Sequence, residues 1–184
     1  MGRSILGALA GLLGGTALLG LGGATAGAAE VSKEYQLKAA FLYNFTKFVE
    51  WPPVRFADQT SPIIVGVLGR NPFSDELAKI VKDRTVNGRA IIVKLVATPE
   101  EMSAVHLLFV PVGEEIRLPL ADWQHAAVVA VGESEAFAAL GGTITFVPAG
   151  DKVRFEVNIA AAGRGGVKIS AQLQKLATVV RREP

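Results

Sequence analysis

The sequence predicts a single α/β domain in which helices flank a mainly parallel central sheet, followed by a C-terminal antiparallel hairpin and a closing helix. Short apolar runs alternate with helical segments through the middle of the chain. A pair of strands with one polar face follows, and an amphipathic segment stands at each end of the domain. Near-continuous apolar strands separated by helices are typical of a parallel sheet covered on both faces.

The first 28 residues have the parts of a secretory signal peptide. Arg3 supplies the positive charge, Ile5–Leu21 is apolar, and Ala26-Gly-Ala28 fits the cleavage rule, with Ala24-Thr-Ala26 as a second choice. An uncleaved membrane anchor is the alternative, because residues 5–29 approach the roughly 20 residues that span a bilayer. The glycines and the cleavage motif favour removal, so we expect a periplasmic domain over 29–184.

Composition limits the function classes. The 156 residues that remain of the 184 suit one domain with its own hydrophobic core. The chain has no cysteine, which excludes thiol catalysis and cysteine-based metal sites. Without Arg3, 18 basic residues stand against 17 acidic ones, a net charge of +1, with no long basic run. We therefore expect no nucleic-acid binding.

An amphipathic helix is expected from Val31 to Glu50, and Trp51-Pro52-Pro53 ends it because proline disfavours helical backbone in the residue before it. Tyr43 and Trp51 lie outside its apolar stripe, and together with Lys47 they are candidate contacts to a protein partner. The stripe itself consists of Leu37, Phe41, Phe45, Phe48 and Val49.

Strands and helices alternate after this helix. The strands are expected at 63–68, 90–96, 106–110 and 126–131. The helices are expected at 71–82, 98–103, 118–124 and 134–140.

The hairpin is expected from 143–147 and 152–159, with Glu156 and Asn158 on its polar face. That face is a candidate recognition surface or an ordinary solvated one. Residues 160–166 are expected to form a small-residue loop. The closing helix over 169–180 leaves Lys168, Gln172 and Lys175 exposed as further candidate contacts, again with a solvated face as the alternative.

The sequence favours neither catalysis nor a cofactor or metal. Gly66–Phe73 lies between a strand and a helix but lacks the glycines and lysine of a phosphate-binding loop, which favours a structural turn. Ser134 follows a strand as a nucleophile would, yet both histidines precede it, which favours a helix N-cap. His106 and His125 are not spaced as metal ligands.

Four segments resemble the YfiR-like family of periplasmic regulatory proteins: 35–52, 64–73, 153–159 and 167–177. The resemblance includes His106 and the Gly141-Gly142 pair. The matching segments follow one another in the family's order along the mature chain. It implies a regulator that represses an inner-membrane diguanylate cyclase by binding its periplasmic domain, and so limits cyclic-di-GMP signalling and biofilm formation. It further implies sequestration by an outer-membrane lipoprotein and allows a homodimer.

This chain lacks the cysteines that form disulfides in a member of the family, so redox control does not carry over to it. The leading hypothesis is a periplasmic protein-binding regulator that is not an enzyme. The alternative is a periplasmic small-ligand sensor that uses the carboxyl ends of the parallel strands near Gly69 and Gly132.

Overall fold

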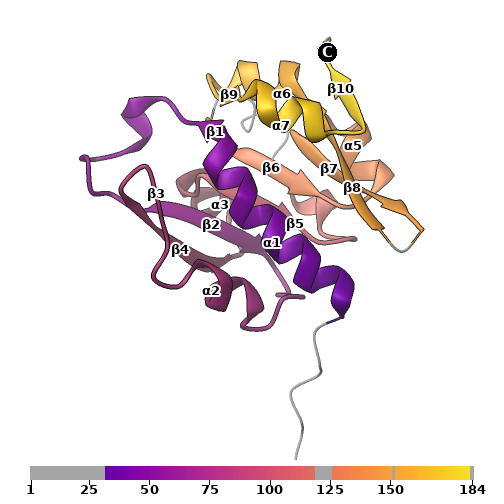
Figure 1. The fold of residues 1–184 in the computed structure, drawn as a ribbon, viewed down its shortest axis with the longest axis horizontal. Helices are drawn as coiled ribbons and strands as arrows, with labels where there is room; N and C mark the ends of the chain where they lie inside the picture. Colours follow the sequence, from indigo (N-terminus) through magenta and orange to yellow (C-terminus); the bar gives the residue numbers. More distant parts are fainter. Residues whose placement is uncertain (1–31, 119–125, 151, 183–184) are drawn as a thin grey trace, which may run out of the picture.

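The computed structural model describes residues 32–118, 126–150 and 152–182. In these residues an eight-stranded sheet has the order β10-β8-β7-β6-β5-β2-β4-β3, and β1 and β9 form a separate ribbon (Figure 1). The strands are β1 Val49–Glu50, β2 Ile63–Leu68, β3 Thr85–Val86, β4 Arg89–Val96, β5 Leu107–Val110, β6 Val129–Gly132, β7 Ile144–Ala149, β8 Lys152–Asn158, β9 Lys168–Ile169 and β10 Val179–Arg181. The helices are α1 Lys33–Phe48, α2 Glu76–Val81, α3 Pro99–Ala104, α5 Glu135–Ala139, α6 Ile159–Arg164 and α7 Ala171–Leu176, with 3-10 turns at Pro53–Arg55 and Glu115–Arg117.

The centre of the sheet is parallel. Strands β4, β2, β5, β6 and β7 lie side by side in one direction. Strand β8 returns antiparallel to β7 in the expected hairpin, and β10 then adds to β8 in parallel. The predicted fold class, a single α/β domain with a mainly parallel sheet and an antiparallel hairpin near its end, is confirmed.

An apolar core covers each face of the sheet. On one face Phe45 of α1 packs on Phe155 and Phe146, with ring centroids 5.1 and 5.8 Å away. On the other face Met102 of α3 and Phe137 of α5 join a second buried cluster. Complete burial of such side chains stabilises the fold by about 1.5–3 kcal/mol each.

Helix α1 crosses its face of the sheet against the direction of the parallel strands. Near its start, Lys38 contacts Glu133, which follows the carboxyl end of β6. Just beyond its end, Trp51 contacts His106, which precedes the amino end of β5. The helix therefore places one set of side chains at each edge of the sheet.

The buried stripe of α1 differs from the expected one. Leu37 is 42% exposed, while Phe41 and Phe48 are half-buried. Phe41 reaches sideways onto Phe155, with ring centroids 5.7 Å apart, so large side chains at the helix flank still join the core. The side chains that face the sheet are those of Lys38, Ala39, Leu42, Phe45 and Thr46.

The expected loop and closing helix at the C-terminus were wrong in part. The segment 160–166 is mostly helical, because the Asn158 side chain caps α6 by accepting the N–H of Ala161 at 2.9 Å. The closing helix is only α7. After it the Thr178 N–H donates to the Phe155 carbonyl at 2.8 Å, and the chain becomes the edge strand β10.

Helix α2 begins later than expected. The Asn71 side chain accepts the Phe73 N–H at 2.9 Å and holds a turn, and Ser74 has a φ of 52°, so regular helix begins only at Glu76. The expected helix over 118–124, apart from Leu118, and the signal peptide over 1–28 lie outside the described residues. In the ranges that are described, no helix has the length and apolar character needed to span a membrane.

Candidate functional site

The start of α1 lies over the carboxyl ends of β5 and β6. Ser32 begins the helix by accepting the N–H of Tyr35 at 3.3 Å, and Glu34 in the first turn suits the positive end of the helix dipole. Parallel α/β sheets commonly bind ligands at this edge. The residues that α1 brings to this edge are therefore candidate site residues.

A buried cluster of charges joins α1 to the strand ends. The Lys38 ammonium lies 2.5 Å from the Glu133 carboxylate and 2.5 Å from that of Glu34. The same Glu133 carboxylate accepts the Tyr35 hydroxyl at 3.0 Å and the Val112 N–H at 3.1 Å. The side chains of Lys38 and Glu133 are only 6% and 2% exposed. The cluster thus fixes the start of α1 against two loops of the sheet.

Burial raises the pKa of Tyr35 to about 12, and the neighbouring Glu133 carboxylate adds to the rise. The Tyr35 hydroxyl therefore keeps its proton at neutral pH and remains a donor to Glu133. Because the ion pair is buried, removing one partner leaves an uncompensated charge, at a cost of about 3–5 kcal/mol.

Ser134 and Glu115 lie beside this cluster. The Ser134 hydroxyl accepts the Phe137 N–H at 3.0 Å, which confirms the predicted N-cap of α5, and it donates to the Glu115 carboxylate. His106 stands at the amino edge of the sheet, so Ser134 has no imidazole beside it in the described part of the chain. The arrangement positions a helix and offers no activated nucleophile.

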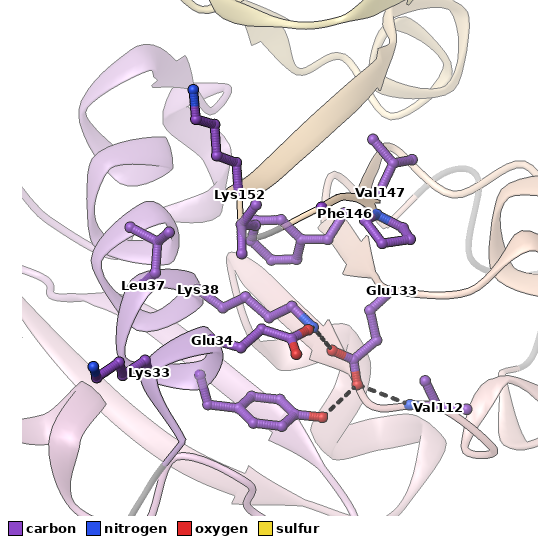
Figure 2. A pocket seen from close by; sticks show the side chains of 13 residues that line it. Lys33, Glu34, Leu37, Lys38, Val112, Glu133, Phe146, Val147 and Lys152 are labelled. Carbon is purple, nitrogen blue, oxygen red and sulfur yellow. Dashed lines mark hydrogen bonds and ion pairs between the residues drawn. The ribbon is translucent and has the colours of Figure 1, made fainter.

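A cavity of about 510 Å³ opens next to the cluster, between α1 and the β7–β8 hairpin. Figure 2 shows Lys38 and Glu34 pointing from α1 toward Glu133, with Phe146 and Lys152 on the hairpin side. The α1 side thus carries the ion-paired charges, and the hairpin side combines apolar side chains with one lysine. The lining residues are Lys33, Glu34, Tyr35, Leu37, Lys38, Val112, Glu133, Phe146, Val147, Pro148, Gly150, Lys152 and Val153.

A second cavity, of about 560 Å³, lies at the amino edge of the sheet beyond the end of α1. Trp51, Phe56, Arg89 and Lys168 are among its lining residues. One of these aromatic residues, Trp51, is only 9% exposed and belongs to the hydrophobic core. The Trp51 indole N–H donates to the His106 carbonyl at 2.9 Å.

His106 is buried behind this second cavity. Its ring stacks on Phe56, with centroids 4.6 Å apart, and its Nδ1 accepts the Ile64 N–H at 3.0 Å. Burial lowers the pKa of His106 to about 4, and the nearby Arg55 charge acts in the same direction. The imidazole is therefore neutral at physiological pH and links two neighbouring strands of the sheet.

The β1–β9 ribbon brings the start of α7 close to the end of α1, and several of the predicted partner contacts belong to these elements. The ribbon pairs Glu50, after α1, with Lys168, and the Ser170 N–H at the start of α7 donates to the Phe48 carbonyl at 2.9 Å. We use the name ribbon surface for five predicted contacts from the second half of α1, from β9 and from α7. They are the half-buried Tyr43 and the exposed Lys47, Lys168, Gln172 and Lys175.

Within the ribbon surface, the half-buried Tyr43 ring lies under the ammonium of Lys47, 4.2 Å from the ring centroid, and near Arg84 at 4.9 Å. Lys168, Gln172 and Lys175 are exposed. Trp51, a further predicted contact, is buried and lines the second cavity.

Glu156 and Asn158 lie apart from the ribbon surface. They alternate with Phe155 and Val157, whose side chains are buried beneath α1, so they project from the opposite face of β8. Glu156 pairs with Arg181 at 3.0 Å, and Asn158 caps α6. Both have local structural partners, and their role in recognition stays a prediction.

Sequence reasoning missed the charge cluster at the start of α1. A signal for Lys38 was present, because Lys38, Leu42, Phe45 and Val49 recur at helical spacing and form a stripe that contains one charge. A lysine in a buried stripe requires an acidic partner. The partner, Glu133, lies 95 residues away, and only the fold brings it there.

In residues 32–118, 126–150 and 152–182, no three His, Asp or Glu side chains gather as metal ligands. No curated protein matches the chain. A crystal structure of a conserved domain protein from Vibrio cholerae matches with a TM-score of 0.47 and 9% identity, over 80% of this chain and 60% of that one.

A family model described as YfiR/HmsC-like matches residues 35–178. The match begins at Tyr35, in the charge cluster, and ends just before β10, so it includes the residues at both the carboxyl and the amino ends of the parallel strands. The chain therefore belongs to the YfiR/HmsC-like family.

Proposed function

We propose that this chain is exported to the periplasm and represses an inner-membrane diguanylate cyclase by binding the cyclase's periplasmic domain. Membership of the YfiR/HmsC-like family over residues 35–178 is the observation that carries the proposal. Proteins of this family are known as periplasmic regulators of diguanylate cyclases that act through protein partners. The chain then acts by binding and needs no active site.

The ribbon surface supports protein binding. Its Lys175 side chain is exposed and forms no ion pair within the described residues, and the exposed Lys168 lies opposite Glu50 across the ribbon without an ion pair to it. Tyr43 adds an aromatic ring of the kind that is enriched in interfaces. This combination favours a partner that presents carboxylates, because complementary charge speeds association and fixes orientation.

Repression follows from differential affinity. A regulator that binds only the inactive arrangement of the cyclase shifts its equilibrium by no more than the difference in affinity for the two states. An outer-membrane lipoprotein that sequesters the regulator would reverse the shift. A homodimer would present the ribbon surface twice.

Cyclic-di-GMP in a strain that lacks the gene tests this proposal. We expect the level to rise on deletion and to fall again when the full chain is restored, but not when a version without residues 1–28 is supplied. An unchanged level on deletion would contradict repression of a cyclase.

A charge reversal on the ribbon surface localises the effect. Lys175→Glu should weaken complementation, whereas Lys94→Glu, at a lysine that is also exposed but lies on β4, should not. Equal loss in both variants would argue against the ribbon surface as the binding face.

A small-ligand sensor is the second candidate function, and the cavity at the carboxyl edge of the sheet favours it. In that case a metabolite, acting on this chain, would control another envelope signalling protein. Thermal unfolding of the purified protein against a metabolite panel separates the two candidates, because only a sensor is stabilised by a small molecule.

A further inference from the structure

We propose that the cavity between α1 and the β7–β8 hairpin binds a small amphipathic carboxylate. Its anionic group would lie beside the buried Lys38, with the exposed Lys33 and Lys152 at the rim, and its apolar part would lie against the hairpin. The proposal deepens the ligand-sensor candidate by naming the class of ligand, and it rests on that candidate only for the consequence in signalling.

The charge balance of the lining favours an anion. Three lysines and two glutamates line the cavity. Both glutamates, Glu34 and Glu133, are engaged by Lys38. Lys33 and Lys152 are exposed and have no acidic partner in the described residues. These two unneutralised cations line the cavity from opposite walls, α1 and the hairpin (Figure 2), and the lining has a net charge of +1, which a single carboxylate balances.

Lys38 adds a buried donor. An ammonium group has three N–H donors, and the carboxylates of Glu34 and Glu133 take two of them. The Lys38 side chain is only 6% exposed. A ligand oxygen that accepted the third N–H would form a charge-assisted hydrogen bond where water screens it little.

The opposite wall favours an apolar group. Phe146, Val147, Pro148 and Val153 come from the hairpin, and the volume of about 510 Å³ is in the range of small-molecule sites. At the rim, Leu37 and Val112 are 42% and 65% exposed. A ligand with a ring or short alkyl chain would remove these apolar surfaces from water.

The site is tested by titrating 4-phenylbutyrate into the ¹⁵N-labelled protein without residues 1–28 and monitoring the backbone amides by NMR. We expect saturable shifts at the start of α1 and along the hairpin. The neutral analogue 4-phenylbutyramide should bind about tenfold more weakly, because it lacks the charge that the lysines meet. Absence of saturable shifts at these residues, or equal affinity for the amide, would overturn the proposal.

Variants at the two exposed lysines keep the test independent of folding. Lys33→Met/Lys152→Met should weaken binding of 4-phenylbutyrate and leave the spectrum otherwise native, while Lys94→Met on β4 should bind as the parent does. Unchanged affinity in the double variant would refute the assigned anion position.

Binding and signalling are measured separately. Affinity for the purified protein tests the site alone, and cyclic-di-GMP in cells given 4-phenylbutyrate tests its role as a sensor. Binding without a change in cyclic-di-GMP would support the site and contradict the sensor function.

Discussion

The two ends of α1 bury their polar groups in opposite ways. At its start, an ion pair between Lys38 and Glu133 is held in the protein interior by Tyr35. Beyond its end, Trp51 and His106 are buried as neutral groups: the Trp51 indole N–H donates to the His106 carbonyl, and His106 Nδ1 accepts the Ile64 N–H. The charged end depends on pairing, whereas the neutral end depends on aromatic packing.

The surfaces beside the two ends of α1 also differ, in their shape and in how their charges are distributed. The cavity at the start of α1 is concave, and the buried Lys38–Glu133 ion pair forms part of its wall. The ribbon surface near the other end spreads its lysines over β9 and α7. We propose the first for a small molecule and the second for a macromolecular partner. Helix α1 connects the two surfaces. A ligand in the cavity would therefore contact the same helix that contributes Tyr43 and Lys47 to the ribbon surface.

The largest effect is expected from breaking the buried ion pair. Lys38→Met leaves the Glu133 carboxylate buried with only the Tyr35 hydroxyl and the Val112 N–H, so the free energy of unfolding should fall by about 3–5 kcal/mol. Arg181→Met breaks the exposed pair with Glu156, where the arginine side chain is 52% exposed, and should cost about 1 kcal/mol or less. Denaturant unfolding measures both.

A double variant shows whether charge is the cause. Lys38→Met/Glu133→Leu removes both charges, so it should recover much of the stability that the single change loses. If the double variant were less stable than Lys38→Met, the hydrogen bonds that Glu133 accepts from Tyr35 and Val112 would outweigh the cost of its buried charge.

An intermediate effect is expected from acid at the neutral end. The pKa of His106 is lowered from 6.5 to about 4 in the folded protein, so the unfolded chain binds more protons between these values. Stability that is complete above pH 6.5 should therefore decline as pH falls toward 4. Thermal unfolding between pH 6.5 and 5, above the range in which ordinary carboxylates titrate, measures the decline.

His106→Asn is the matched variant, because an amide oxygen takes the place of Nδ1 as acceptor for the Ile64 N–H. It should be less stable at pH 7 but should lose less stability between pH 6.5 and 5. An identical pH profile in the variant would show that another group causes the acid sensitivity.

The sequence was sufficient for the parallel sheet and the hairpin because their signals are local. Continuous apolar runs indicate buried parallel strands, and the alternation in β8 separates Phe155 and Val157 from Glu156 and Asn158. The last strand was missed because the periodicity over 169–180 is also compatible with one long helix. Only the pairing of Val180 with Val157 shows that the chain becomes an edge strand.

The site was harder to predict than the fold, since its members are distant in sequence. Lys38 and Glu133 are unremarkable separately, and the edge at which they meet depends on where α1 crosses the sheet. The ribbon surface was partly predictable, because exposed polar residues on short amphipathic elements carry a local pattern. Its assembly from α1 and α7 required the β1–β9 pairing.

The smallest effect on stability is expected from charge reversal on the ribbon surface. Lys168 is the register partner of Glu50 across β1 and β9, so Lys168→Glu places like charges opposite each other and should cost about 0.2–1 kcal/mol. Lys175→Glu, exposed on α7, should change stability by about 0.5 kcal/mol or less. Thermal unfolding at low and high salt checks both values, because salt should reduce the cost of Lys168→Glu. A cost as large as that of Lys38→Met would mean that the ribbon depends on its charges as the buried cluster does, and the contrast between the two ends of α1 would not hold.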